Sequence, residues 1–268
     1  MEKVISGISS LDSILGGGIT KGSVILLLGE VGSGYYEFAF TSAITNSVKN
    51  GGSEDESHAP GVSYLSMTRS IEDIEFEIQS SFSDMESGAI NIIDFSESYF
   101  SNSNIPLSWI TDDMDKKLGL LGNAGSNNGV LRGIVDCLDE RADSNIIVLD
   151  SLTALTRVYR SDDEWGDFIK FLQGLQRISK QWGGIIYLIL TANIFDNSRE
   201  EEIADVVDGV FHFKWEDKGT GERRRSMFIK KLRGDVPRLE SLNLSWFDVV
   251  ISSSDGLDLE PIRHILVR

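Results

Sequence analysis

Short apolar runs alternate along this chain with segments in which apolar residues recur every three or four positions. The apolar runs have the length of buried strands and cover residues 23–28, 62–67, 90–93, 146–149 and 184–190. The segments with helical spacing cover residues 40–48, 71–82, 131–138 and 165–175. Short buried strands that alternate with amphipathic helices are typical of a parallel sheet with helices on both faces. The pattern therefore predicts an α/β domain with a largely parallel central sheet.

The pattern changes near the end of the chain, where two strand-like runs flank a turn. Residues 210–215 and 226–232 enclose the turn-rich segment DKGTGE and predict a β-hairpin. Alternation places Phe211, Phe213 and Trp215 on one face of this hairpin. Aromatic residues on one face serve either as anchors in a protein interface or as packing against the chain's own sheet. The sequence leaves both interpretations open.

Two regions do not follow the alternating pattern. Residues 96–129 are rich in Ser, Asn, Asp and Gly and are predicted to be a mostly irregular insertion, with a short helical turn at 114–121. Residues 236–268 are predicted to be a C-terminal β extension. Because no linker divides the chain, residues 1–268 are predicted to form a single domain.

Charge and cysteine usage exclude several kinds of protein. The chain has 25 Lys and Arg against 42 Asp and Glu, a net charge of −17, which does not suit a surface that follows nucleic acid or anionic lipid. The single cysteine, Cys137, excludes an internal disulfide and a zinc site built on several cysteines, and no metal site is predicted. The apolar runs are far shorter than the ~18–20 residues of a membrane span, and no apolar signal segment opens the sequence. We therefore expect a cytoplasmic protein that does not enter the membrane.

The segment that carries chemistry is GEVGSGYY, which follows a predicted strand and precedes a predicted helix. It comprises Gly29, Glu30, Val31, Gly32, Ser33, Gly34, Tyr35 and Tyr36. Glycines at this spacing let backbone N–H groups curl around phosphates, as in the phosphate-binding loop G-x-x-x-x-G-K-[ST]. In that loop the Lys neutralises the β- and γ-phosphates, and the Ser or Thr hydroxyl binds Mg²⁺. Here Tyr35 and Tyr36 stand at these two positions.

The context of this loop resembles the opening of KaiC-like proteins, a branch of the RecA superfamily of P-loop ATPases. The matching residues are Gly7, Leu11, Asp12, Leu15, Gly16, Gly17, Gly18, Ile19, Gly22 and Ser23. The run IIVLDSLT resembles the family's Walker B strand, which puts Asp150 where an Asp acts on Mg²⁺, with Ser151 after it. The resemblance covers most of residues 4–235 and implies a RecA-like fold. We expect residues 29–34 at the carboxyl end of a strand, and Asp150 at the end of a neighbouring strand close by.

The resemblance also implies roles for two further pairs of residues. The segment GERRRSMFIKKLRG resembles the family's hairpin that ends in K-x-R-G, whose Lys and Arg reach the γ-phosphate bound by the neighbouring subunit of a ring. Here these residues are Lys231 and Arg233. The family also ends its second strand with a Glu-Glu pair that polarises the attacking water. Thr68 and Arg69 stand there instead, and neither acts as a general base near neutral pH.

Three functions remain open on this sequence. The first is a KaiC-like pseudo-ATPase without catalytic residues, binding ATP and Mg²⁺ weakly or not at all. It would regulate or scaffold signal transduction through a protein partner or a homo-oligomeric ring or stack. The second is a recombination paralogue that binds DNA or a recombinase through residues 156–166 and 193–209, although six acids in the latter segment repel phosphates. The third is an active ATPase with a rewired site, in which Arg69 or a neighbour supplies the missing cation.

Overall fold

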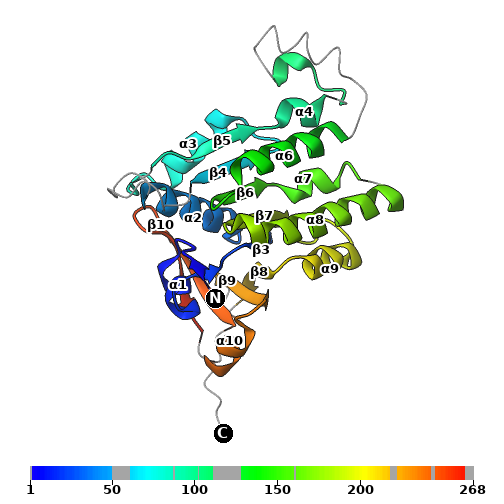
Figure 1. Cartoon of the computed structure of the whole chain (residues 1–268). Coiled ribbons are helices and arrows are strands. Elements are labelled where there is room, and N and C mark those ends of the chain that lie inside the picture. Colours follow the sequence, from blue (N-terminus) through cyan, green and yellow to red (C-terminus); the bar gives the residue numbers. More distant parts are fainter. Residues whose placement is uncertain are drawn as a thin grey trace.

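A nine-stranded sheet forms the centre of the part of the chain that the structure describes, in the order β11-β10-β9-β8-β3-β7-β6-β4-β5 (Figure 1). The structure is a computed structural model that describes residues 2–49, 61–86, 88–101, 103–110, 128–159, 161–217, 222–242 and 245–262. The parallel strands are β3 (Ser23–Gly29), β4 (Val62–Ser66), β5 (Asn91–Asp94), β6 (Ile146–Asp150), β7 (Ile185–Thr191) and β8 (Gly209–Asp217). The antiparallel strands are β9 (Arg223–Leu232), β10 (Trp246–Ser252) and β11 (Gly256–Pro261). The α/β fold with its largely parallel sheet and C-terminal hairpin is confirmed.

Helices cover both faces of the sheet because its central strands are apolar on both sides. Ile25 and Leu27 of β3 point into one core, while Val24, Leu26 and Leu28 point into the other. The first core is closed by α1 (Ser9–Leu15), α2 (Tyr35–Lys49) and α3 (Ile71–Ser81). The second is closed by α6 (Asn128–Arg141), α7 (Leu152–Thr156), α8 (Asp162–Trp182) and α9 (Asn197–Val206). A separate two-stranded ribbon joins β1 (Lys3–Val4) to β2 (Ile19–Thr20).

The region predicted to be irregular contains helices at both of its ends. It includes α4 (Ser96–Phe100) and the 3₁₀ turn η1 (Leu107–Trp109), and α6 begins inside it. The helix α4 forms because Asp94 accepts the Ser96 backbone N–H, at 2.7 Å, and because Phe95 and Tyr99 pack on the core beside α6. The predicted turn at 114–121 lies outside the described residues.

The predicted C-terminal β extension begins with a helix. This is α10 (Val236–Leu242), which forms because Leu239 is buried against the core and its N–H donates to the Asp235 carbonyl. The strands β10 and β11 then pair with each other in antiparallel fashion. Residues 263–268 lie outside the described part.

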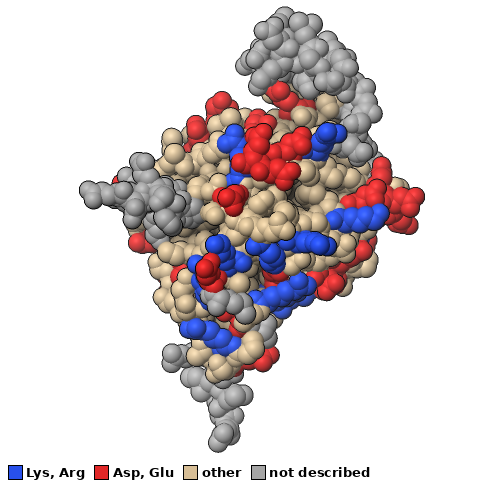
Figure 2. Space-filling view, viewed as in Figure 1, with Lys and Arg blue, Asp and Glu red and all other residues tan. Residues whose placement is uncertain are grey.

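The acidic chain carries its positive charges unevenly. Figure 2 shows Lys and Arg side chains gathered in a band across the middle of the viewed face, with Asp and Glu concentrated above it and at one edge. Among the described helices, none is long and apolar enough to cross a membrane. In the same residues, no group of three or more His, Cys, Asp and Glu side chains is placed to hold a metal ion.

Candidate functional site

The glycine loop connects β3 to α2 at the carboxyl end of the parallel strands. Gly32 and Gly34 have φ angles of +76° and +109°, which favour glycine. A Cβ at Gly34 would lie 3.0 Å from the Val249 side chain, so a larger residue there would crowd Val249. The N–H of Ser33 donates to the Glu30 carbonyl at 3.0 Å and closes the turn. The loop therefore keeps the backbone conformation that its glycines predict.

The hairpin of β8 and β9 holds the outer side of this loop. The indole N–H of Trp215 donates to the Val31 carbonyl at 3.1 Å, and Arg225 Nε donates to the Gly32 carbonyl at 2.9 Å. The Arg225 guanidinium also lies 4.6 Å from the centre of the Trp215 ring, within cation–π range. These contacts tie the loop to the chain's own sheet.

Two of the three aromatic side chains on the predicted hairpin face lie in the core of the chain itself. Phe211 and Phe213 are fully buried, and both rings pack edge-on against Phe38 of α2. Trp215, the third of them, contacts the glycine loop. The interface interpretation is wrong for Phe211 and Phe213, because α2 covers that side of the sheet.

Tyr35 lies over the glycine loop. Its side chain is buried, and a Cβ added at Gly29 would overlap its ring. Its hydroxyl lies 3.2 Å from the Thr191 hydroxyl at the end of β7. Where the loop pattern would hold an extended, charged Lys, an aromatic ring packs against the first glycine of the loop.

The Tyr36 side chain reaches the end of β6, the strand that resembles Walker B. Its hydroxyl donates to one carboxylate oxygen of Asp150 at 2.9 Å. Strand β7 lies between β3 and β6, so the expectation that Asp150 ends a strand directly beside the loop's own strand is wrong. The expected proximity nevertheless holds, because the long Tyr36 side chain spans the gap.

Asp150 is enclosed by groups of its own chain. It is 3% exposed, and the fully buried Tyr64 on β4 donates to its second oxygen at 2.8 Å. The Arg69 guanidinium lies 3.9 Å from that oxygen and also pairs with Glu77 of α3. Burial raises the pKa of the Asp150 carboxyl, while the hydrogen bonds from Tyr64 and Tyr36 and the charge of Arg69 oppose the rise.

Because the pKa of Asp150 is raised in the folded protein, the contribution of Asp150 to folding stability depends on pH. A carboxyl whose pKa is higher folded than unfolded binds its proton more readily in the folded state, so it contributes most stability below the unfolded pKa. That contribution is lost as pH rises through the folded pKa. We therefore expect the melting temperature of the unmodified protein, minus that of Asp150→Asn, to increase as pH falls from 7 to 4. Calorimetry at several pH values measures this difference, and a difference that shrinks on acidification contradicts the assignment.

Comparisons with known proteins identify the family of this chain. A family model described as the KaiC ATPase matches residues 4–245, which is most of the chain. The chain belongs to the KaiC ATPase family. No curated protein matches the sequence significantly.

Two solved structures share the KaiC-family fold. One is KaiC-like protein PH0186 from Pyrococcus horikoshii, with 19% identity, a TM-score of 0.61, and coverage of 97% of this chain and 99% of that one. The other is the flagellar accessory protein FlaH from Methanocaldococcus jannaschii, with 16% identity, a TM-score of 0.59, and coverage of 93% and 94%. At these identities the likeness concerns the fold alone.

The remaining residues singled out by the KaiC resemblance lie in separate places. Thr68 is exposed just beyond β4, next to Arg69. Ser151 caps the N-terminus of α7, where its hydroxyl accepts the Ala154 N–H at 3.3 Å. Of the two positions expected to carry carboxylates, only Arg69 contacts Asp150.

Lys231 and Arg233 lie at the opposite end of the hairpin from the glycine loop. Lys231 Nζ donates to the carbonyls of Ala204 and Asp205 at 3.0 and 2.6 Å, near the C-terminus of α9. Arg233 lies 3.6 Å from the buried carboxylate of Asp208. Desolvation, followed by the charge of Arg233, lowers the pKa of Lys231. These cations stabilise the carboxyl end of a helix, where positive charge is favourable.

Three residues of the site have roles that the sequence pattern does not indicate. The pattern places Tyr64 in a buried strand, Glu77 in a helix and Arg225 in the hairpin, but does not indicate their contacts with Asp150, Arg69 and Gly32. Of these three residues, only Tyr64 has a feature in the sequence that suggests a contact, because a Tyr in a buried strand needs a hydrogen-bond partner for its hydroxyl. The identity of that partner depends on which strand lies next to β4.

Proposed function

We propose that this KaiC-family chain is a pseudo-ATPase that acts as a regulatory or scaffold subunit in signal transduction. The observation that carries the proposal is the enclosure of Asp150. Both of its carboxylate oxygens accept hydrogen bonds from tyrosine hydroxyls, at 2.9 and 2.8 Å. We infer from these two hydrogen bonds that the Asp150 carboxylate has a structural role and does not take part in ATP hydrolysis.

The residues around Asp150 do not fit a magnesium ion. Mg²⁺ requires near-ideal octahedral geometry at about 2.0–2.1 Å from oxygen ligands. The Tyr36 side chain stands where the loop pattern has the Mg²⁺-binding hydroxyl, and it is held on Asp150. The Arg69 guanidinium lies 3.9 Å from the same carboxylate and supplies positive charge there. A divalent cation would have to displace these groups and be repelled by Arg69.

Nucleotide binding is a separate question from hydrolysis. The glycines keep the positive φ angles of such a loop, although the N–H groups of Glu30 and Ser33 already donate to carbonyls of the chain. The missing Lys removes a charge-assisted hydrogen bond of about 1.5–3 kcal/mol, which weakens binding roughly ten- to a hundredfold. We expect ATP to bind weakly or not at all.

The other two functions have less support. Three acidic residues of the segment after β7 contact other groups of the same chain. Asp196 caps α9, and Glu202 accepts the Trp165 indole N–H at 2.6 Å. Glu201 pairs with Lys230. Such a surface does not favour a DNA backbone. A rewired ATPase would need a cation from Arg69 or from a neighbour at the phosphates, and the Arg69 guanidinium contacts Glu77 and Asp150 instead.

A scaffold role predicts assembly that depends on the K-x-R-G pair. We expect the double variant Lys231→Ala, Arg233→Ala to weaken self-association or partner capture at least tenfold, about 1.4 kcal/mol. Light scattering and pull-down on the intact protein measure this. The control is Lys21→Ala, Lys170→Ala, which removes two exposed positive charges elsewhere.

Circular dichroism must accompany that assay, since Lys231 also bonds to carbonyls near the end of α9. If the double variant folds but no longer assembles, and the control variant is unaffected, the result supports a contact of Lys231 and Arg233 with a second protein chain. If both variants behave like the unmodified protein, the hairpin pair acts only within its own chain.

A further inference from the structure

Two residues of the β8–β9 hairpin contact the glycine loop at three consecutive positions. The Glu30 carboxylate accepts the Trp215 backbone N–H at 3.1 Å. The next two residues use their carbonyls: that of Val31 accepts the Trp215 indole N–H at 3.1 Å. That of Gly32 accepts the Arg225 Nε at 2.9 Å. The loop therefore supplies the acceptors of all three hydrogen bonds, and the hairpin supplies the donors.

Trp215 and Arg225 also contact each other. They are direct partners in the register of β8 and β9, and the guanidinium carbon of Arg225 lies 4.6 Å from the centre of the Trp215 ring, within cation–π range. A Cβ added at Gly32 would lie 3.8 Å from the same ring, so the loop backbone passes close to it. Because loop, indole and guanidinium contact one another, we expect the loss of one contact to weaken the others.

Inside the glycine loop, one polar group lacks a partner among the described residues. The Ser33 backbone N–H donates to the Glu30 carbonyl at 3.0 Å. The Ser33 hydroxyl is fully buried and has no hydrogen-bond partner in the described part of the chain. Val31 is 79% exposed, so burial does not hold the tip of the loop. Since glycines lose the most backbone freedom on ordering, the hairpin contacts supply much of the order of this loop.

We propose that Trp215 and Arg225 form a clamp that keeps the glycine loop in one conformation without a bound ligand. The loop and the β8–β9 hairpin then open only together, as one unit. Both residues are positioning residues, because they act on the backbone of the loop. The inference concerns the order of the loop and not the chemistry beside Asp150, so it does not rest on the pseudo-ATPase proposal.

Amide hydrogen exchange of the ligand-free protein tests the clamp, read by mass spectrometry over residues 30–38. Trp215→Phe keeps an aromatic ring but loses the indole donor, and Arg225→Gln loses the guanidinium. We expect each to speed exchange in this segment about fivefold or more, because exchange follows the local opening that these contacts oppose. The double variant should speed exchange by less than the product of the two single effects, since the two side chains support each other.

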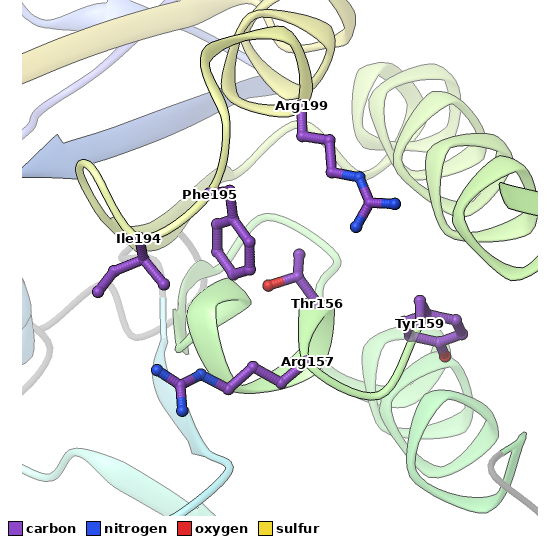
Figure 3. A pocket seen from close by; sticks show the side chains of 6 residues that line it. All are labelled: Thr156, Arg157, Tyr159, Ile194, Phe195 and Arg199. Atoms are coloured by element: carbon purple, nitrogen blue, oxygen red, sulfur yellow. The ribbon is translucent and has the colours of Figure 1, made fainter. Parts of the chain in front are cut away.

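Arg199→Gln is the matched control, because the Arg199 guanidinium carbon also lies close to a tryptophan ring, 4.7 Å from that of Trp165. Figure 3 shows Arg199 with Thr156 and Phe195 around a hollow, and none of its described lining residues belongs to the glycine loop. Exchange over residues 30–38 should be unchanged in this variant. Ser33→Ala removes only the hydroxyl without a partner and should also leave the exchange unchanged.

Exchange in β6, at the centre of the sheet, reports the global fold and should stay as slow as in the unmodified protein. The clamp is overturned if Trp215→Phe and Arg225→Gln leave exchange over residues 30–38 unchanged, or if they speed it equally in β6. Equal acceleration by Arg199→Gln or Ser33→Ala overturns it too, and single effects that multiply in the double variant overturn the joint opening. If Arg225→Gln does not fold, Arg225→Lys, which keeps the charge but lacks the Nε donor, replaces it with the same expectation.

Discussion

The purified protein should release no phosphate from ATP above a buffer control, with or without Mg²⁺. The physical reason is that the Asp150 carboxylate accepts hydrogen bonds from Tyr36 and Tyr64, while Thr68 and Arg69 cannot activate water. A phosphate-release assay measures the rate. Clear Mg²⁺-dependent turnover by the unmodified protein would refute the pseudo-ATPase proposal.

A stepwise set of variants separates binding from turnover. Tyr35→Lys with Tyr36→Thr restores the loop pattern, and we expect ATP to bind roughly ten- to a hundredfold more tightly. Turnover should stay at background until Thr68→Glu and Arg69→Glu are added, because these supply the carboxylates that activate water. Tyr36→Phe is the matched control, since it removes one hydroxyl and restores no charge. Turnover in the first double variant would show that the carboxylate pair is dispensable.

Replacing Asp150 by Ala should destabilise the fold by about 3–5 kcal/mol. The change leaves the fully buried Tyr64 hydroxyl without its acceptor and takes a carboxylate from beside Arg69. At about 2–4 °C per kcal/mol for a chain of this size, the melting temperature should fall by roughly 10 °C. Asp167→Ala is the control: its carboxylate is exposed and pairs with Lys170, so we expect a change within about 0.5 kcal/mol.

Magnesium gives this experiment a second readout. On the proposed structural role of this carboxylate, adding Mg²⁺ or EDTA should leave the melting temperature of the unmodified protein unchanged. A melting temperature that rises with Mg²⁺ in the unmodified protein but not in Asp150→Ala would identify Asp150 as a metal ligand. Equal stability of Asp150→Ala and the unmodified protein would remove its structural role.

The sequence by itself determined the strands of the parallel sheet and the main helices of this protein, but not the short helices α4 and α10. Apolar runs such as Val24–Leu28 are short and are followed by glycines, which favours strands buried on both faces, and the spacing of glycines in the loop indicates where the chain turns into α2. The residues present at the Lys, hydroxyl and carboxylate positions are also readable directly. These features depend on neighbours within a few positions, which is the range over which periodicity and turn chemistry act.

Only the tertiary structure decided how the site is filled. Tyr64 and Asp150 are 86 positions apart, and Trp215 and Val31 are 184 apart. Their contacts follow from the order of strands, which places β4 directly beside β6 and β8 directly beside β3. The burial of Phe211 and Phe213 follows from the position of α2 over the hairpin. No local pattern encodes strand order, because apolar strands of equal length can pair with one another in many orders, and the packing of the whole sheet selects among them.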